Sequence, residues 1–194
     1  MLEVKQIMTL SRIPLFEISA FVYSIPNWEE KKIKLMNMLD GVEYQWHRCS
    51  TDFFLFDGRA EYFDEWYSIL EDDLNHVLPN LQLPFLPKEY WQLWSQEYRN
   101  QEFHGPHNHG NAVMSAVLYL DLHYAEHQGT TFYSPFVEPF TGAVPDVTAN
   151  VNEGDIVFFP GSLLHESRPS LSDRVRRIIS FNLPIKLFEA PMDN

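Results

Sequence analysis

The stretch "HGPHNHGNAVMSAVLYLDL" (residues 104–122) holds both the clearest strand of the sequence and an unusual group of histidines. Its second half is a long run of apolar residues rich in β formers, which favours a buried strand. Its first half packs three of the chain's eight histidines into seven residues. This stretch lies mid-chain and is interrupted by Gly, Pro and Asn, so it is not a cloning tag. It indicates either a metal site or a His-rich turn beside a strand.

The C-terminal half of the chain reads as a series of short strands separated by turn residues. Successive short strands with Gly and Pro between them favour a β-sandwich or a closed barrel. The candidate strands are "YWQLWSQEYR" (90–99), "AVMSAVLYLDL" (112–122), "TTFYSPF" (130–136), "GDIVFFP" (154–160) and "RVRRIISFNLP" (174–184).

The N-terminal part reads as mixed α and β. Residues 17–26 are β-rich and end at a proline, and residues 42–56 are aromatic and β-branched, which favours a strand or extended chain. A first helix is expected over residues 27–41, with Asn27 as its N-cap and Gly41 past its end. Residues 59–81 carry apolar side chains at the spacing of an amphipathic helix.

We therefore expect one domain over residues 1–194. Residues 1–89 would form a mixed α/β part whose helices pack onto a β core at residues 90–188. A chain of 194 residues can bury a substantial core in one such unit.

Composition and charge exclude several function classes. The net charge of −13 argues against nucleic acid as a partner, because phosphate binding depends on clustered Lys and Arg. No segment approaches the roughly 20 apolar residues of a membrane-spanning helix. The first 16 residues lack the layout of a signal peptide. Together with the single cysteine, Cys49, this predicts a cytoplasmic protein that does not bind membranes.

Three histidines and one arginine carry the chemical signal. His107 and His109 project to the same side if this stretch is extended, so two imidazoles can chelate one metal ion. His165, which follows the strand at residues 155–159 and a Pro-Gly turn, is the candidate third ligand.

In the last strand, alternation places Arg176 on one face and Arg177 on the other. A lone arginine inside a barrel needs an anionic partner, and its planar guanidinium suits a carboxylate.

The order His-x-His, "SAVLYLDL", "GTTF", "GDIVFFPGSLLH", Arg and "SFN" resembles the 2-oxoglutarate and Fe(II)-dependent oxygenases, most closely a bacterial and phage branch. The resemblance runs from about residue 94 to residue 184. It implies a mainly β fold with a double-stranded β-helix (jelly-roll) core that holds iron at one end. It implies a hydroxylase acting on a small molecule or a peptide side chain, with oligomeric state left open.

The resemblance also assigns roles to individual residues. His107, His109 and His165 would be the metal ligands, and Arg176 would bind a carboxylate of 2-oxoglutarate. Ser180 and Tyr119 would assist at the cosubstrate. Arg177 takes the place of Arg176 if a bulge shifts the register of the strand.

One position departs from the pattern of that superfamily, because His109 stands where an aspartate is usual. Either the site is a three-histidine site, or His104 or a distant Asp replaces His109, or water completes a two-residue site. We favour the three-histidine site because spacing and strand parity are retained. Two further functions stay open: a cupin-like metal dioxygenase that uses no 2-oxoglutarate, and a non-catalytic jelly-roll module such as a virion component.

Overall fold

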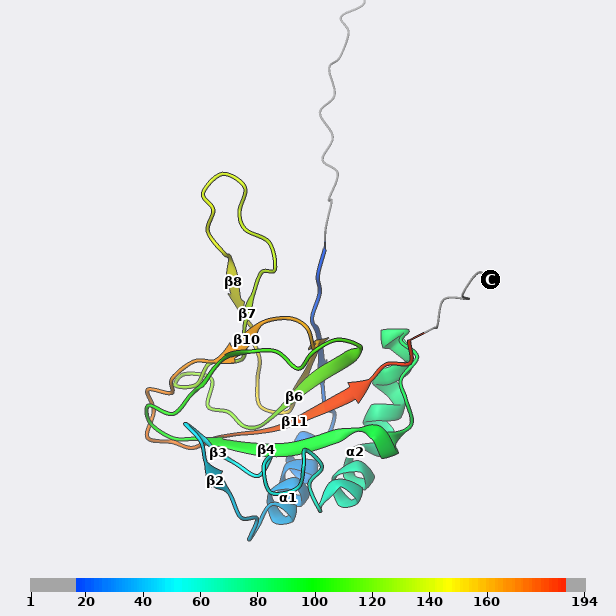
Figure 1. The fold of residues 1–194 in the computed structure, drawn as a ribbon. Helices are drawn as coiled ribbons and strands as arrows, with labels where there is room; N and C mark the ends of the chain where they lie inside the picture. The colour runs from blue at the N-terminus through cyan, green and yellow to red at the C-terminus, as the bar shows by residue number, and fades with distance from the viewer. Residues whose placement is uncertain (1–16, 188–194) are drawn as a thin grey trace, which may run out of the picture.

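The computed structural model describes residues 17–187, so the N-terminal segment on which the signal-peptide prediction rests lies outside the described residues, as does residue 188 at the end of the expected core. The chain forms two antiparallel sheets with two helices on one side (Figure 1). The elements are β1 (Phe21–Ser24), α1 (Trp28–Met38), β2 (Gln45–Trp46), β3 (Ser50–Thr51), α2 (Phe63–Val77), η1 (Leu78–Leu81), η2 (Lys88–Tyr90), β4 (Gln92–Tyr98), β5 (His104–His107), β6 (Val113–Asp121), β7 (Thr131–Tyr133), β8 (Asp146–Thr148), β9 (Asp155–Pro160), β10 (His165–Ser167) and β11 (Arg176–Pro184).

The strand order identifies the core as a jelly roll. The larger sheet runs β1-β9-β6-β11-β4-β3-β2, and the smaller sheet runs β5-β10-β7-β8. Rings from the two sheets meet between them, with Phe132 of β7 against Phe159 of β9 at 4.9 Å between centroids. The predicted mainly β, jelly-roll fold is confirmed, and each of the five predicted C-terminal strands contains an observed strand.

The long apolar run of the sequence lies at the centre of the larger sheet. Strand β6 pairs with β11 on one side and β9 on the other, and residues 114–120 are all buried. A strand that is covered on both faces reads as a continuous apolar run rather than as an alternating one. Here the helices cover one face, and the smaller sheet faces the other.

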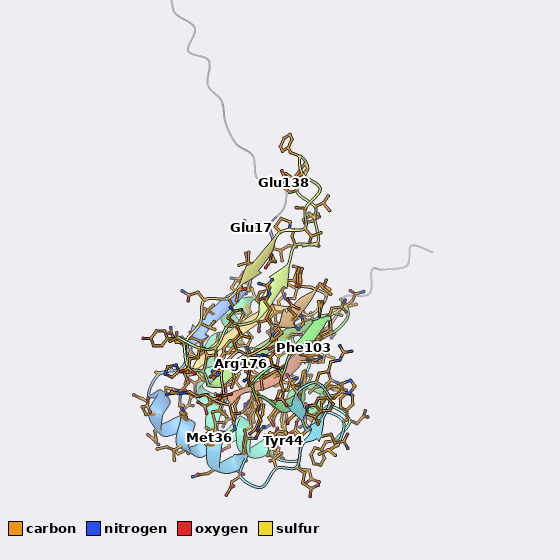
Figure 2. The ribbon with its side chains drawn as sticks, turned by 90° about the vertical axis from the view of Figure 1, so that its left-hand side faces the viewer. Glu17, Met36, Tyr44, Phe103, Glu138 and Arg176 are labelled. Carbon is orange, nitrogen blue, oxygen red and sulfur yellow. The ribbon has the colours of Figure 1, made fainter. Side chains whose placement is uncertain are left out.

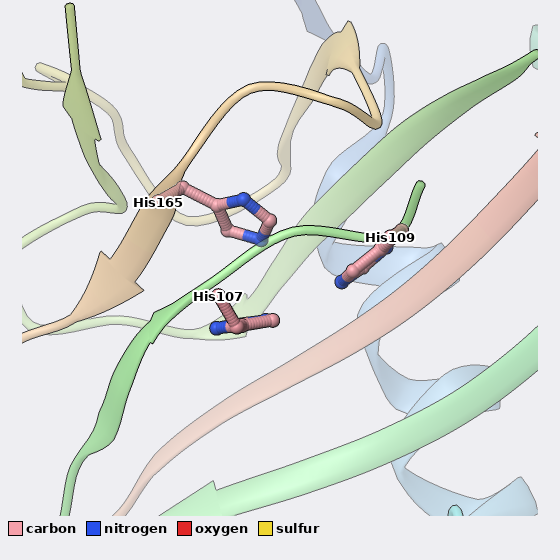
Figure 3. Close-up of side chains that lie close together, drawn as sticks. All are labelled: His107, His109 and His165. Carbon is pink, nitrogen blue, oxygen red and sulfur yellow. The ribbon is translucent and has the colours of Figure 1, made fainter. Parts of the chain in front are cut away.

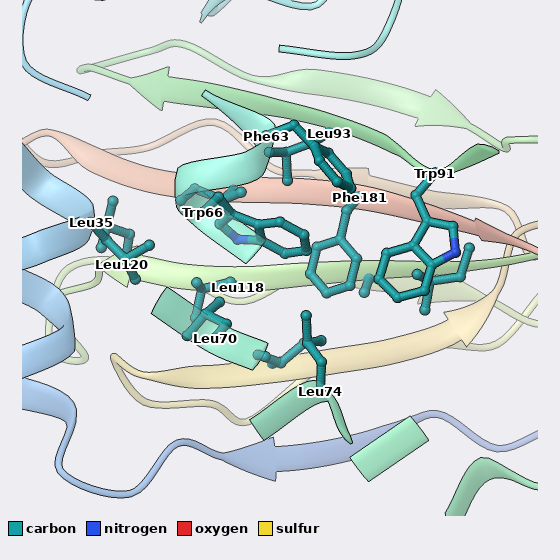
Figure 4. Packing of buried hydrophobic residues seen from close by; sticks show 14 of the residues in the cluster. Leu35, Phe63, Trp66, Leu70, Leu74, Trp91, Leu93, Leu118, Leu120 and Phe181 are labelled. Carbon is teal, nitrogen blue, oxygen red and sulfur yellow. The ribbon is translucent and has the colours of Figure 1, made fainter. Parts of the chain in front are cut away.

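Helix α2 supplies much of the core on the helical side (Figure 4). Its apolar stripe buries Phe63, Trp66, Leu70 and Leu74 against the larger sheet, as the sequence pattern predicts. The Trp66 ring lies 4.9 Å from that of Phe181 in β11, measured between centroids. Neither helix in the described chain combines the length and hydrophobicity needed to cross a membrane.

Two local predictions need correction. Asn27 does precede α1, but its backbone has φ 53° and its side chain makes no capping hydrogen bond. Asn tolerates this left-handed conformation, so the turn after Pro26 takes precedence over side-chain capping. Residues 42–56 form only the short strands β2 and β3, and the aromatic residues that follow them lie in turns.

The hairpin that joins β7 to β8 projects from the body of the molecule (Figures 1 and 2). Glu138 lies in this hairpin, whereas Arg176 lies within the body. The hairpin also carries Phe140, which is 96% exposed. Its side chain therefore contributes little to the packed core.

A pair of phenylalanines tests the packing. We expect Phe181→Ala to lower the free energy of unfolding by about 3–5 kcal/mol, because it removes a fully buried ring between Trp66 and Phe158. The matched variant Phe140→Ala should change it by less than about 0.5 kcal/mol. Urea denaturation followed by circular dichroism measures both. Similar losses in the two variants would contradict the described core.

Candidate metal and cosubstrate site

Pairing between β5 and β10 brings together histidines that lie far apart in the chain. His165 of β10 is the direct partner of His107 of β5. His109 follows just beyond the end of β5, where its backbone N–H donates to the carbonyl of Gly161 at 2.7 Å. The candidate ligand nitrogens of the three rings all lie within 4.8 Å of one another (Figure 3).

Hydrogen bonds set the tautomer of two of these rings. His107 Nδ1 lies 2.8 Å from the carbonyl oxygen of Gly105, and His165 Nδ1 lies 2.9 Å from that of Leu163. A carbonyl oxygen only accepts, so each Nδ1 carries the proton and donates it. The lone pair of each ring is then on Nε2. Metal-binding histidines are held in this way in proteins, with the second ring nitrogen donating to a backbone carbonyl.

His109 is held by side chains instead. Its Nδ1 lies 2.7 Å from Oδ1 of Asn182, which also accepts a 2.8 Å hydrogen bond from Ser115 Oγ. The amide orientation of Asn182 follows from its Nδ2, which donates to Gln92 Oε1 at 2.8 Å. The amide oxygen therefore accepts the proton on Nδ1 of His109. All three histidines thus present Nε2 as the free acceptor.

The three rings favour the neutral form, which is the form that binds metal. Burial lowers the pKa of His165 to about 3, and repulsion from His107 adds to the effect. Burial also lowers the pKa of His107 and of His109. No proton has to leave these Nε2 atoms at neutral pH before a cation binds.

His104 lies beside the cluster but is directed differently. Its ring stacks on that of His107 at 3.9 Å between centroids, and its Nδ1 is 3.3 Å from the Nε2 amide of Gln96. The amide donates to this nitrogen, so the tautomer of His104 is opposite to that of the other three. His104 is not part of the group whose nitrogens converge.

Arg176 lies at the inner end of the site and is 3% exposed. Its Nη1 donates to the carbonyl of Gln128 at 2.6 Å, its Nη2 donates to Ser167 Oγ, and its guanidinium lies 4.3 Å from the centroid of the Tyr98 ring. Its Nε is buried and has no hydrogen-bond partner among the described residues. Within residues 17–187, Arg176 forms no ion pair, so a buried positive charge remains uncompensated there.

Arg177 points the other way. Its Nε donates to Glu97 at 2.6 Å and its Nη1 lies 3.6 Å from Asp121, on the partly exposed side of the sheet. A register shift does occur between Arg177 and Ile178 in the pairing with β6, but the pairing with β4 stays continuous. The inward residue is therefore Arg176.

A narrow chamber of about 30 Å³ is lined by the histidines and by Ser167 and Tyr98, the two side chains that contact this arginine. Ser180 lines it and donates a long hydrogen bond to Gln96 at 3.4 Å. Tyr119 lies behind the wall, where its hydroxyl is bonded to the backbone and side chain of Thr130. The structure thus brings the predicted residues to one interior, with Tyr119 one layer further out.

Sequence reasoning missed the residues that hold these groups in place. Ser167 and Tyr98 contact the guanidinium of Arg176, and Asn182 and Ser115 hold His109. The alternation of side chains along each strand could have indicated two of them. Asn182 lies on the same face of its strand as Arg176, and Ser115 lies on the same face of its strand as Tyr119. Nothing in the sequence pairs Asn182 with His109, which lies 73 residues away.

Comparison with known proteins identifies the core. Residues 92–182 match the sequence profile of a family described as "Putative 2OG-Fe(II) oxygenase". This match covers just under half of the chain, and over it the jelly-roll core is similar to that family. The matched segment contains the three histidines and Arg176. No curated protein sequence matches the chain.

Solved structures of oxygenases share the fold of this domain. A prolyl-4-hydroxylase from Pseudomonas putida superposes with a TM-score of 0.60 at 15% identity, over 87% of this chain and 94% of the other. HygX from Streptomyces hygroscopicus, with nickel and 2-oxoglutarate bound, gives a TM-score of 0.62 at 14% identity, over 88% and 84%. A prolyl hydroxylase from Trichoplax adhaerens, in complex with a hypoxia inducible factor peptide, gives 0.59 at 10% identity, over 85% and 83%.

The family and these neighbours support a 2-oxoglutarate- and Fe(II)-dependent oxygenase. The neighbours include enzymes crystallised with 2-oxoglutarate and a metal, and enzymes named for peptide substrates. At identities of 10–15% they establish the fold of this chain and not its substrate.

Single histidine variants test the metal site. We expect His107→Ala, His109→Ala and His165→Ala each to weaken Ni(II) binding by more than about 100-fold, beyond the loss typical of removing a supporting residue. His104→Ala is the matched control and should stay within about tenfold of the parent, because its ring lies outside the converging group. Isothermal titration calorimetry under argon measures the affinities. If His104→Ala weakened Ni(II) binding as much as His107→Ala and His165→Ala do, and His109→Ala had no effect, then His104 and not His109 would be the metal ligand.

Proposed function

We propose that His107, His109 and His165 hold Fe(II), that Arg176 binds the distal carboxylate of 2-oxoglutarate, and that the enzyme hydroxylates a C–H bond of a small molecule or a peptide side chain. When bound, the two cofactors supply an O₂-dependent oxidation that converts C–H to C–OH while 2-oxoglutarate becomes succinate and CO₂. The remaining chemistry belongs to side chains of this chain.

The observation that carries the proposal is the environment of Arg176. An isolated buried charge is very costly unless it is paired, and Arg176 is buried with neutral partners and one unsatisfied N–H. A carboxylate beside Ser167 would satisfy that N–H and offset the charge. A dioxygenase that acts without 2-oxoglutarate has no general need for such a residue, so this feature favours the 2-oxoglutarate-dependent reaction.

The three-histidine set is compatible with Fe(II), because imidazole nitrogens suit iron as well as zinc, copper and nickel. Each Nδ1 proton is already donated, which orients the Nε2 lone pairs before the metal arrives. The chamber lined by the histidines and Ser167 has room for about two waters as it stands. A molecule the size of 2-oxoglutarate therefore requires its side-chain walls to move outward on binding.

An anaerobic titration tests the function as a whole. Adding Fe(II) and then 2-oxoglutarate should produce the weak visible charge-transfer band of the iron chelate. Admitting O₂ should then release succinate, even without the natural substrate. The metal-free protein and a His165→Ala variant serve as controls and should show neither signal. Absence of both signals in the parent protein would exclude the oxygenase function.

Substitution of Arg176 tests the cosubstrate site separately. We expect Arg176→Ala to weaken 2-oxoglutarate binding by about 100-fold or more, because a buried charge-assisted pair is lost. Fe(II) affinity should stay nearly unchanged. Arg177→Ala is the matched control and should bind both normally, since its partners are Glu97 and Asp121. Loss of metal and cosubstrate together, or loss of neither, would contradict the role given to Arg176.

A further inference from the structure

A second cavity opens on the outer side of the histidines, toward solvent. It has a volume of about 400 Å³ and is lined by residues from β3, β4, β5 and β11, from the turn between β2 and β3, and from the segments that follow β3 and β5. This volume lies within the usual range for a small-molecule site. His104, His107 and His109 form its floor, so whatever occupies it lies next to the proposed iron. The inference below rests on the proposed function for that position.

The lining of this cavity is free of charged side chains. None of its thirteen residues is Asp, Glu, Lys or Arg, although the whole chain has 27 acidic and 14 basic residues. Burying a charged group there would leave it without a partner, which is very costly. Three neutral imidazoles add no charge to Fe(II), and the proposed pairing of Arg176 with one carboxylate of 2-oxoglutarate leaves the three groups together with a net charge of about +1. The residues that line the outer cavity add no charge of their own.

One wall of the cavity is aromatic. The Phe53 ring lies edge-on to Phe54 at 5.2 Å and to Trp94 at 5.1 Å, measured between centroids. Trp94 continues the wall to His109, with 5.6 Å between their rings. Such a surface favours another ring, because aromatic pairs contribute beyond the area that they bury.

Neutral amide side chains also line the cavity. Gln96 and Asn182 are already bonded to His104 and His109. Asn108 lies at the exposed mouth, where its Oδ1 accepts from the backbone of Gly110 at 3.1 Å. Side-chain amides pair with neutral donors and acceptors, such as those of an amide-linked group entering from solvent.

We infer that this cavity, lined by aromatic and amide side chains, binds an uncharged ring that is part of a larger molecule. Any charged groups of that molecule stay in solvent, outside the mouth of the cavity. A free amino acid is disfavoured, because its ammonium and carboxylate would both enter a cavity whose lining residues offer neither a counter-ion. A ring attached through neutral amide bonds matches both the aromatic and the amide side chains of the lining. The residues that select it are Phe53, Phe54 and Trp94.

Three probe molecules separate the contributions of the ring and of the charge to binding. N-acetyl-L-phenylalaninamide has the ring and no charge, and L-phenylalanine has the ring together with an ammonium and a carboxylate. N-acetyl-L-alaninamide has no ring and no charge. Ligand-observed NMR measures their binding to the metal-free protein and again to the protein with Ni(II) and 2-oxoglutarate. We expect the neutral ring to bind at least tenfold more tightly than either of the other two.

Variants locate the binding. Phe53→Ala should weaken the neutral ring at least tenfold, and Phe54→Ala, at a more exposed position, gives a second measurement if Phe53→Ala fails to fold. Phe140→Ala, in the projecting hairpin, should leave binding unchanged. Equal or tighter binding of L-phenylalanine, no advantage of the ring over alanine, or no detectable binding of the neutral ring would each overturn the inference.

The outcome is separable from that of the proposed function. Failure of the charge-transfer band with a preserved preference for the neutral ring would reject the oxygenase and keep the ring site. A normal band with no such preference would reject the ring site alone.

Discussion

The alternation of side chains along β11 is the constraint on which the rest of the structure depends. This strand lies between β4 and β6, so both of its faces are covered. Ile179, Phe181 and Leu183 face the helices and join the larger hydrophobic cluster. Arg176, Ser180 and Asn182 face the other way, into the site. A shift of one residue would exchange these two sets and bury Arg177 in place of Arg176.

This arrangement links stability to the site. The ring of Phe181 packs on Trp66 of α2, while the next residue, Asn182, holds His109. Packing of the helices against the sheet therefore sets the position of the polar face of β11. The smaller sheet contributes the rest, because pairing of β10 with β5 places His165 opposite His107. Neither sheet alone contains the site.

The site places three neutral imidazole ligands and several neutral polar groups near the buried guanidinium of Arg176. Three imidazoles present unprotonated nitrogens, and Arg176 is the charged group at the inner end. The two hydroxyl or carbonyl partners of Arg176 are neutral, so the field of the arginine extends along the chamber toward the histidines. An anionic ligand that spans this chamber would meet a positive charge at both of its ends once a metal is bound. The outer cavity, by contrast, carries no charge on its lining.

Much of the fold was predictable because its strands are long, apolar or alternating. The runs that became β4, β6, β9 and β11 were identified from their composition, and the stripe of α2 from its spacing. The structure of residues 42–56 was not predicted correctly, because a composition rich in aromatic residues is typical both of strands and of segments that line a cavity. Asn27 shows a similar limit, because its backbone turn rather than its side chain determines how α1 begins.

The sequence by itself determined which residue types are available, their spacing in the His-x-His motif and which face of β11 each side chain takes. These follow from local geometry, since alternation along a strand needs no knowledge of its neighbours. Only the tertiary structure decided that His165 meets His107, that Asn182 holds His109 and that His104 turns away toward Gln96. It also decided that Arg176 has no carboxylate beside it among residues 17–187. Such contacts depend on how the two sheets pair and pack, because the residues that form them are brought together by strands distant in the chain.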